Sequence, residues 1–212
     1  MRVVGVDGFA RGWVAVALED GHFAGASVHR RFADVLALRD VRIVAVDIPI
    51  GLPATEPRAA DVGAKELVGS TVFLTYPRHV LEAETYAQAL ARARRDGWPG
   101  VSRQSYALRH KILEVDPLAA RDARIVEVHP ELSFRELAGS RLGASKHTWA
   151  GFWARVRLLA AAGVRLPEDL AGLPLVDVVD AAAAAWSADR YARGRAKPVP
   201  LGHRDRLGAI WR

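Results

Sequence analysis

The sequence contains no cysteine. Disulfides, thiolate nucleophiles and cysteine-ligated zinc or iron–sulfur sites are therefore excluded. It also has no apolar run near the roughly 18 residues that a membrane-spanning helix needs. The chain turns acidic at Asp7, too early for a secretory signal. We therefore expect a cytoplasmic protein without a membrane partner.

Lysine is scarce as well, so arginine supplies most of the positive charge. Lys and Arg total 30, Asp and Glu total 24, and the net charge is +6. The planar arginine fork suits phosphate geometry, and this charge permits a polyanionic partner, although arginine-rich usage also follows from genome composition. With 212 residues, half of them hydrophobic, the chain has room for one folded domain, which we expect to span residues 1–212.

The first fifty residues predict three strands, a helix and a fourth strand. Asp20-Gly21 is a strong hairpin signal between the second and third strands. The fourth strand is almost wholly apolar, as expected for a strand buried on both faces of a sheet. The expected strands are Arg2–Asp7, Trp13–Glu19, His22–His29 and Arg42–Ile48, and the expected helix is Phe32–Leu38.

Residues 49–115 predict a long insertion after the fourth strand. Prolines and glycines punctuate residues 49–81, and long ordered loops of this kind tend to be functional. A fifth strand is expected beyond the insertion, at Arg124–His129, and the tail is expected to pack back through Leu207, Ile210 and Trp211. The expected helices are Ala59–Val68, Leu81–Asp96, Gln104–Val115, Glu131–Ala138, Thr148–Ala162 and Val176–Arg193.

Carboxylates fall at the ends of the predicted strands. Asp7 and Asp47 each end an apolar strand, and Glu127 and Glu131 lie in or just beyond the fifth. Ligands bind at the carboxyl ends of strands in open α/β sheets, and a carboxylate buried there needs a hydrogen bond, a counter-charge or a metal.

The last predicted helix supplies two further acids. Asp177 and Asp180 are three residues apart near its start, so they share one helix face. If all these acids meet, divalent cations would relieve their repulsion, and two cations about 4 Å apart form a template for phosphoryl displacement. Taken singly, each aspartate is also compatible with a turn or a helix end.

Several other side chains are weaker candidates. His129 could orient a ligand or act as a general base, and Arg58, Arg78 and Lys146 could bind phosphate oxygens, although each also fits a structural or solvated role. The arginines between positions 92 and 103 could attract nucleic acid or form a solvated helix face. Three tryptophans at apolar-periodic positions are expected in the core: Trp13, Trp153 and Trp186.

These motifs, taken in order, resemble the domain of unknown function 429 family, over residues 3 to about 208. The segments that carry the resemblance are Gly5-Val6-Asp7-Gly8 with Gly12-Trp13, Val46-Asp47-Ile48-Pro49-Ile50-Gly51-Leu52-Pro53, Glu127-Val128-His129-Pro130-Glu131, Ser145-Lys146, and Asp177 with Asp180.

The resemblance implies an α/β, ribonuclease-H-like fold. Its sheet would be mixed and five-stranded, with three antiparallel strands followed by parallel ones, and flanked by helices. Members of the family are regarded as predicted nucleases. In ribonuclease-H-like enzymes, acids equivalent to Asp7, Asp47 and Asp180 bind two Mg²⁺ or Mn²⁺ ions, and Asp177 would assist. Glu127 or Glu131 would fill the remaining corner; Glu131 is preferred because it lies beyond the strand end.

The sequence therefore predicts a metal-dependent nuclease, with Arg78 and Lys146 contacting phosphate. Two alternatives stay open. One is a non-catalytic domain of the same fold that binds nucleic acid or a partner, and the other is a small-molecule phosphotransferase or phosphatase, suggested by Asp7-Gly8 with Gly12. The sequence does not indicate whether the substrate is RNA or DNA, or whether cleavage is endo or exo. It also leaves the oligomeric state open, a dimer included.

Overall fold

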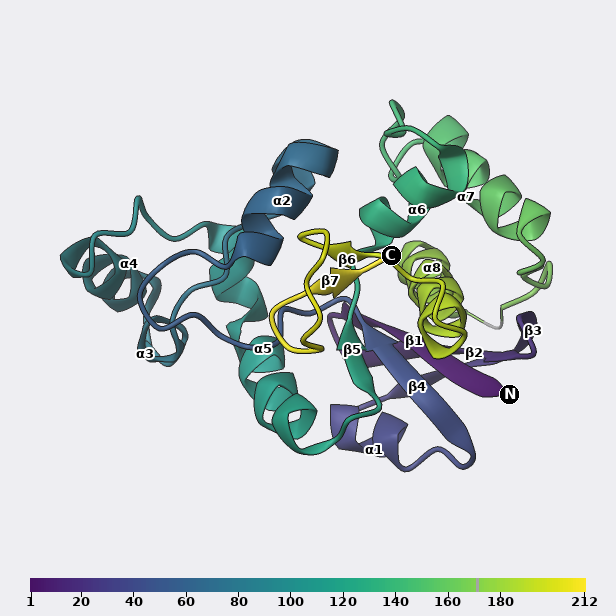
Figure 1. Ribbon diagram of the computed structural model, residues 1–212, viewed down its shortest axis with the longest axis horizontal. Helices are drawn as coiled ribbons and strands as arrows, with labels where there is room; N and C mark the ends of the chain where they lie inside the picture. The colour runs from purple at the N-terminus through teal and green to yellow at the C-terminus, as the bar shows by residue number, and fades with distance from the viewer. Residues whose placement is uncertain (171) are drawn as a thin grey trace.

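A five-stranded mixed sheet forms the centre of the computed structural model, which describes residues 1–170 and 172–212 (Figure 1). The strand order is β3-β2-β1-β4-β5. The first three strands are antiparallel neighbours, while β4 and β5 run parallel to β1. This confirms the predicted α/β sheet and is consistent with a ribonuclease-H-like arrangement. The strands are β1 Arg2–Phe9, β2 Gly12–Glu19, β3 His22–His29, β4 Val41–Val46 and β5 Ile125–Glu127.

Helices cover both faces of this sheet. One face packs against α1 and α5, and the other against α6, α7 and α8 (Figure 1). The tail returns to the fold as two short paired strands. The bounds are α1 Phe32–Leu36, α2 Ala59–Val68, η1 Gly69–Thr71, α3 Arg78–Leu81, α4 Tyr86–Arg95, α5 Arg103–Arg121, α6 Pro130–Ala138, α7 Trp149–Ala161, α8 Leu175–Ala192, β6 Pro198–Val199 and β7 Ile210–Trp211.

Alternation along the strands decides which side chains meet which helices. Val4 and Val6 of β1 point into the core on the α1 and α5 side. Val3 and, on β4, Ala45 point into the core beneath α8. Because the side-chain period of a strand is two, the next residue on the α8 side after Val3 and Gly5 is Asp7.

Helix α8 lies close to β1 because the residues that face each other on the two elements have small side chains. Residues 181–185 are five buried alanines. A Cβ atom at Gly5 would lie 2.0 Å from the Ala185 nitrogen and 2.1 Å from the Ala181 carbonyl oxygen. Only glycine therefore fits at position 5, and this contact fixes the height of α8 above the sheet.

Two expected helices differ from those observed. The single helix expected at Leu81–Asp96 is divided into α3 and α4. Thr85 caps α4 by accepting a hydrogen bond from the Gln88 nitrogen at 3.2 Å, and Gln88 Oε1 accepts one from the Thr85 nitrogen at 3.3 Å. This capping box starts a new helix. The second difference is α5, which extends to Arg121 through Pro117.

The tryptophans separate into two kinds. Trp13 is fully buried, as expected, and Trp186 packs against the α8 core. The expectation for Trp153 is wrong, because 38% of it is exposed on α7. The buried face of α7 is formed instead by Gly151, Arg155 and Leu159.

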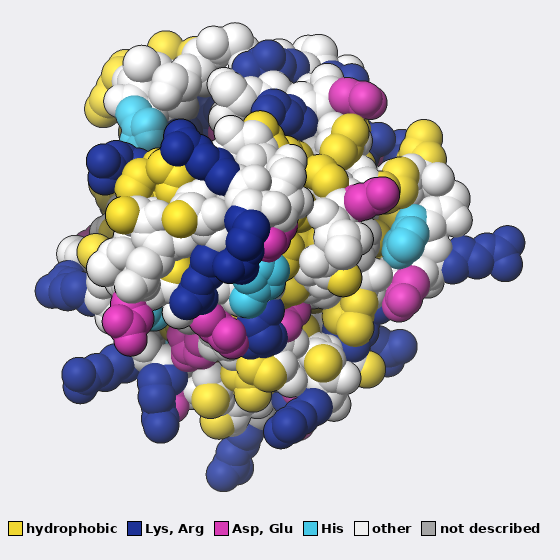
Figure 2. Space-filling model, turned by 90° about the vertical axis from the view of Figure 1, so that its left-hand side faces the viewer, with side chains coloured by type: hydrophobic (Ala, Val, Ile, Leu, Met, Phe, Trp, Pro, Cys, Tyr) yellow, Lys and Arg dark blue, Asp and Glu magenta, His cyan; other side chains and the backbone are white. Residues whose placement is uncertain are grey.

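One face of the molecule carries many basic side chains. Figure 2 shows Lys and Arg side chains spread over the face on the α3 and α4 side, with acidic and histidine side chains grouped near its middle. None of the helices in the part of the chain that the structure describes has the length and apolar character needed to cross a bilayer.

Candidate functional site

Two aspartates lie side by side where β1 and β4 stop pairing. Asp7 does not end its strand as expected, because β1 continues to Phe9 by pairing with β2. Val6 and Val46 are register partners in this parallel pair, and the Asp47 nitrogen donates to the Val6 carbonyl at 3.0 Å. Asp7 and Asp47, the next residues along each strand, therefore extend on the α8 side of the sheet. Asp7 is buried and accepts a hydrogen bond from the Gly8 nitrogen at 2.7 Å.

The first turns of α8 bring two more aspartates to the same place. Asp180 is 1% exposed and directly precedes Ala181, whose carbonyl faces Gly5. Asp177 lies one turn earlier and lines the same cavity as Asp7. The charges of Asp177 and Asp180 both act on Asp7. The structure thus brings together four of the predicted acids.

The pKa values of these carboxyls reflect burial and mutual repulsion. Burial raises the pKa of Asp7 well above 3.8, and the charges of Asp47 and Asp180 raise it further. Burial also raises the pKa of Asp47, against the charges of His129 and Lys146. Burial raises the pKa of Asp180 to about 6 although Lys146 opposes the shift. The cluster therefore resists holding full negative charge at neutral pH.

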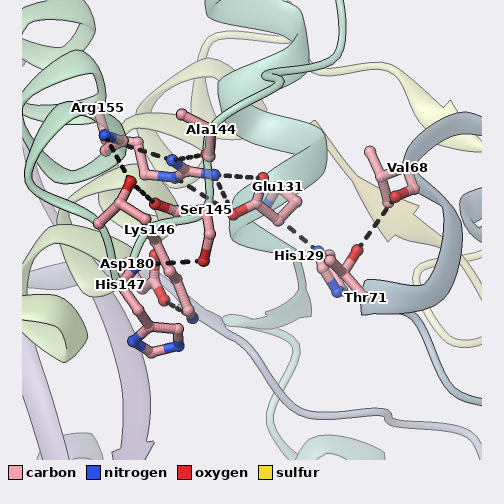
Figure 3. A network of polar contacts seen from close by, with 12 residues as sticks. Val68, Thr71, His129, Glu131, Ala144, Ser145, Lys146, His147, Arg155 and Asp180 are labelled. Carbon is pink, nitrogen blue, oxygen red and sulfur yellow. Dashed lines mark hydrogen bonds and ion pairs between the residues drawn. The ribbon is translucent and has the colours of Figure 1, made fainter.

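Lys146 supplies the cation of this cluster. Its ammonium is paired with Asp180 Oδ2, and it points toward Asp180 from the segment before α7 (Figure 3). Desolvation opposes its charge, but Asp180, Asp47 and Asp7 together raise the pKa of Lys146. Among the described residues, the second oxygen of Asp180, Oδ1, is buried without a hydrogen-bond partner.

Glu131 faces the aspartate cluster from α6 and is held by an arginine. Arg155 of α7 contacts both of its oxygens, with Nη2 at 2.7 and 2.9 Å (Figure 3). Arg155 Nη1 also donates to the carbonyls of Ala144 and Gly151, each at 3.0 Å. One buried guanidinium therefore ties together α6, α7 and the segment that carries Lys146. The sequence analysis did not single out Arg155, whose only signal is a charge on an otherwise apolar helix face.

Glu127 belongs to a different network. It accepts from Arg58 Nη2 at 2.6 Å and from the Ile50 nitrogen at 2.8 Å, and Arg58 also binds Asp61 at 2.8 Å. Although desolvation opposes the charge of Arg58, Glu127 and Asp61 raise its pKa, so the guanidinium stays charged. Arg58 is thus a buried structural residue, and Glu127 points to the opposite side of the sheet from Asp47, as its register with Val46 requires.

A cavity of about 560 Å³ opens over this site. The lining contains most of the predicted residues, together with Arg141 and His147, which the sequence analysis did not single out. Arg78 is not among the described residues that line it; Arg78 pairs with Asp116 at 2.6 Å. The polar and charged residues of the lining are Asp7, Asp47, Asp61, Thr71, Gln104, Glu127, His129, Glu131, Arg141, Ser145, Lys146, His147, Arg155 and Asp177.

The site offers oxygen donors but no assembled ligand set. Carboxylate oxygens suit hard cations such as Mg²⁺ and Mn²⁺. The Oδ1 atom of Asp180, which has no hydrogen-bond partner, is available as a metal ligand. With Lys146 on Asp180, however, the described part of the chain contains no group of three His, Asp or Glu side chains arranged to hold a metal ion.

Fold and site together define an α/β protein with a five-stranded mixed sheet, consistent with a ribonuclease-H-like arrangement, and with an aspartate cluster where β1 and β4 stop pairing. The family model described as "Protein of unknown function (DUF429)" matches residues 5–204, and the chain belongs to this family. No curated protein matches the chain significantly, and no solved structure does.

Proposed function

We propose that the protein is a metal-dependent nuclease that hydrolyses phosphodiester bonds of DNA or RNA. The observation that carries the proposal is a buried cluster of three carboxyl groups whose charges act on one another. Asp7 comes from β1, Asp47 follows the end of β4, and Asp180 comes from α8. Clustered carboxylates that cost folding energy are typical of functional sites.

The chemistry of the carboxylate oxygens fits Mg²⁺ or Mn²⁺, and we expect two ions once Lys146 releases Asp180. Asp7, Asp47 and Asp180 would hold them, and Asp177 would assist. Bound ions would lower the pKa of the attacking water and stabilise the leaving oxygen. The free Oδ1 of Asp180 supports this assignment, because a buried carboxylate oxygen without a partner is costly unless something fills the position.

The chain's own residues would bind and orient the substrate. Glu131, fixed by Arg155, presents a carboxylate to the cavity that could position a water or accept its proton. Lys146 would leave Asp180 when cations replace its charge, and its ammonium could then bind a phosphate oxygen. Arg78 is 45% exposed and engaged with Asp116 outside the cavity lining, so it contributes less to the proposal.

The test is cleavage of single-stranded, duplex, hybrid and branched substrates with Mg²⁺ or Mn²⁺. We expect Asp7→Asn to lower the rate by at least about 100-fold, since ligand substitutions remove metal affinity or activity. Calorimetry should show Mn²⁺ binding to the wild type that is lost in Asp47→Asn. The control is Asp40→Asn, an exposed aspartate at φ 59°, a conformation that asparagine also tolerates. If Asp7→Asn cleaves like the wild type, the chemistry does not use this cluster.

A non-catalytic nucleic-acid-binding domain is the second candidate. The Lys146–Asp180 ion pair favours it, because the ammonium already balances part of the acidic charge without a metal. This alternative predicts binding that is unchanged by EDTA, steep in salt and without turnover on any of the substrates above.

A further inference from the structure

Helix α7 presents two aromatic rings to solvent. Trp149 is 79% exposed and Trp153 is 38% exposed. Their ring centroids lie 5.6 Å apart in an edge-to-face arrangement. Arg157, also exposed, follows four residues later and so lies on the same helix face. Exposed apolar surface of this kind marks a contact site more often than isolated apolar residues do.

The backbone of Trp149 lies close to the cavity. His147 lines the cavity and Trp149 begins α7 two residues later, so their Cα atoms are at most about 7 Å apart. The intervening turn is firmly held. A Cβ atom at Gly151 would lie 2.0 Å from the Ser145 carbonyl oxygen, and Thr148 accepts a hydrogen bond from the Gly151 nitrogen at 3.2 Å.

The charge around the rings favours a polyanion. Residues 137–167 contain no Asp or Glu and five Lys or Arg residues. Lys146 and Arg155 are paired with Asp180 and Glu131, so the charge offered to a partner comes from Arg141, Arg157 and Arg165. A second copy of the chain is a poorer occupant. A two-fold contact would place this basic surface against itself, and like charges facing each other are unfavourable.

We propose that Trp149 and Trp153 form a platform on which an unpaired base of a single-stranded nucleic acid stacks. Exposed aromatic rings beside basic residues bind single strands in this way, since every base offers a π-face. Bases in a duplex already stack on both sides, so the platform would select unpaired nucleotides and lead their backbone toward Lys146. This inference rests on the proposed function for its substrate class, but it concerns binding rather than cleavage.

The experiment is fluorescence anisotropy of short fluorescein-labelled strands, DNA and RNA of one sequence, against their duplexes, all in EDTA. We expect Trp149→Ala to weaken single-strand binding roughly tenfold and duplex binding less than twofold. Trp149→Phe should keep most of the affinity, while Trp149→Leu, which is apolar without a π-face, should not. Leu201→Ala removes another exposed apolar side chain (73% exposed), outside α7, and is the matched control.

The outcomes separate this inference from the nuclease proposal. Loss of single-strand binding in Trp149→Ala supports the platform even if no substrate is ever cleaved. Unchanged binding, equal loss for strand and duplex, or full retention in Trp149→Leu overturns it even if cleavage occurs. Absence of any single-strand binding at low salt also overturns it, as does a dimer of the wild type that Trp149→Ala dissociates.

Discussion

At the scale of single residues, the buried acids fall into two groups that differ in their partners, although burial raises the pKa of both Asp7 and Glu127, the latter to about 7. Asp7 shares its surroundings with other carboxylates, whereas Glu127 is fully paired with Arg58. The first arrangement stores repulsion that a ligand could relieve. The second neutralises a buried cation. Substituting each acid by its amide therefore distinguishes a functional carboxylate from a structural one without any knowledge of substrate.

We expect Asp7→Asn to raise the free energy of unfolding at pH 8 in EDTA, on the order of 1 kcal/mol. The pKa of Asp7 is raised in the folded state, so the native protein holds this proton more tightly than the unfolded chain does. The stabilisation of the folded protein by this bound proton is complete below pH 3.8, the pKa of an unperturbed aspartate. It is lost as the pH rises through the pKa of Asp7 in the folded protein. Urea unfolding should therefore show a difference between variant and wild type that disappears in acid; equal stability at pH 8 would contradict the repulsion.

Glu127→Gln should have the opposite effect. Arg58 would stay paired with Asp61, so no uncompensated charge is left, but the charge-assisted hydrogen bonds from Arg58 Nη1 and Nη2 to Glu127 would be weakened. Hydrogen bonds to charged groups contribute about 1.5–3 kcal/mol, and part of this is offset because burial disfavours the Glu127 carboxylate and raises its pKa to about 7. Urea unfolding at neutral pH measures the loss. A variant as stable as the wild type would show that Glu127 is not a structural residue, and its place in the chemistry would need to be reconsidered.

The choice between Glu127 and Glu131 shows what the sequence could and could not provide. Both glutamates were visible near the end of the fifth strand. The register of Val46 with Glu127 directs Glu127 away from the side of Asp47, which favours Glu131, although both glutamates line the cavity. Strand register depends on tertiary pairing, and a one-residue shift would reverse the assignment.

At the scale of elements, the close contact between β1 and α8 positions the cluster. Gly5→Ala would place a methyl group about 2 Å from the α8 backbone. We expect α8 to move outward, lowering the free energy of unfolding by about 1–3 kcal/mol and weakening Mn²⁺ binding because Asp180 moves with the helix. Calorimetry and urea unfolding measure the two effects.

Gly143→Ala is the stability control for Gly5→Ala, because a Cβ atom at position 143 would meet nothing within 4 Å. If both variants are equally stable, α8 is not held by this contact.

The first four strands and most helices were predictable within a few residues from apolar periodicity. The division of Leu81–Asp96 was also present in the sequence, as the Thr85 and Gln88 capping box. The clamp by Arg155 was not, because it joins α6, α7 and residue 144 only in space.

At the scale of the whole molecule, the order of elements along the chain was predictable but the distribution of charge was not. Apolar runs and the Asp20-Gly21 turn predicted the strands, while the resemblance to the family implied that three antiparallel strands are followed by parallel ones. From the sequence, only the arginines between positions 92 and 103 were candidates for a nucleic-acid surface, and the basic residues between 137 and 167 were not considered as a group. Only the fold places His147 and Arg141 in the lining of the aspartate cavity, which favours the second group.

Salt dependence distinguishes these two surfaces. Each phosphate that a cation neutralises contributes about 0.7 to the slope of log K against log salt for single strands. Arg157 is exposed on the aromatic face of α7, and Arg94 is exposed on α4. We expect Arg157→Ala to reduce the slope for a single-stranded oligonucleotide by about 0.7 and to weaken binding similarly for every base sequence, while Arg94→Ala leaves the slope unchanged. The reverse result would locate the phosphate path on α4, away from Trp149, because counterion release reports only the phosphates that are actually contacted.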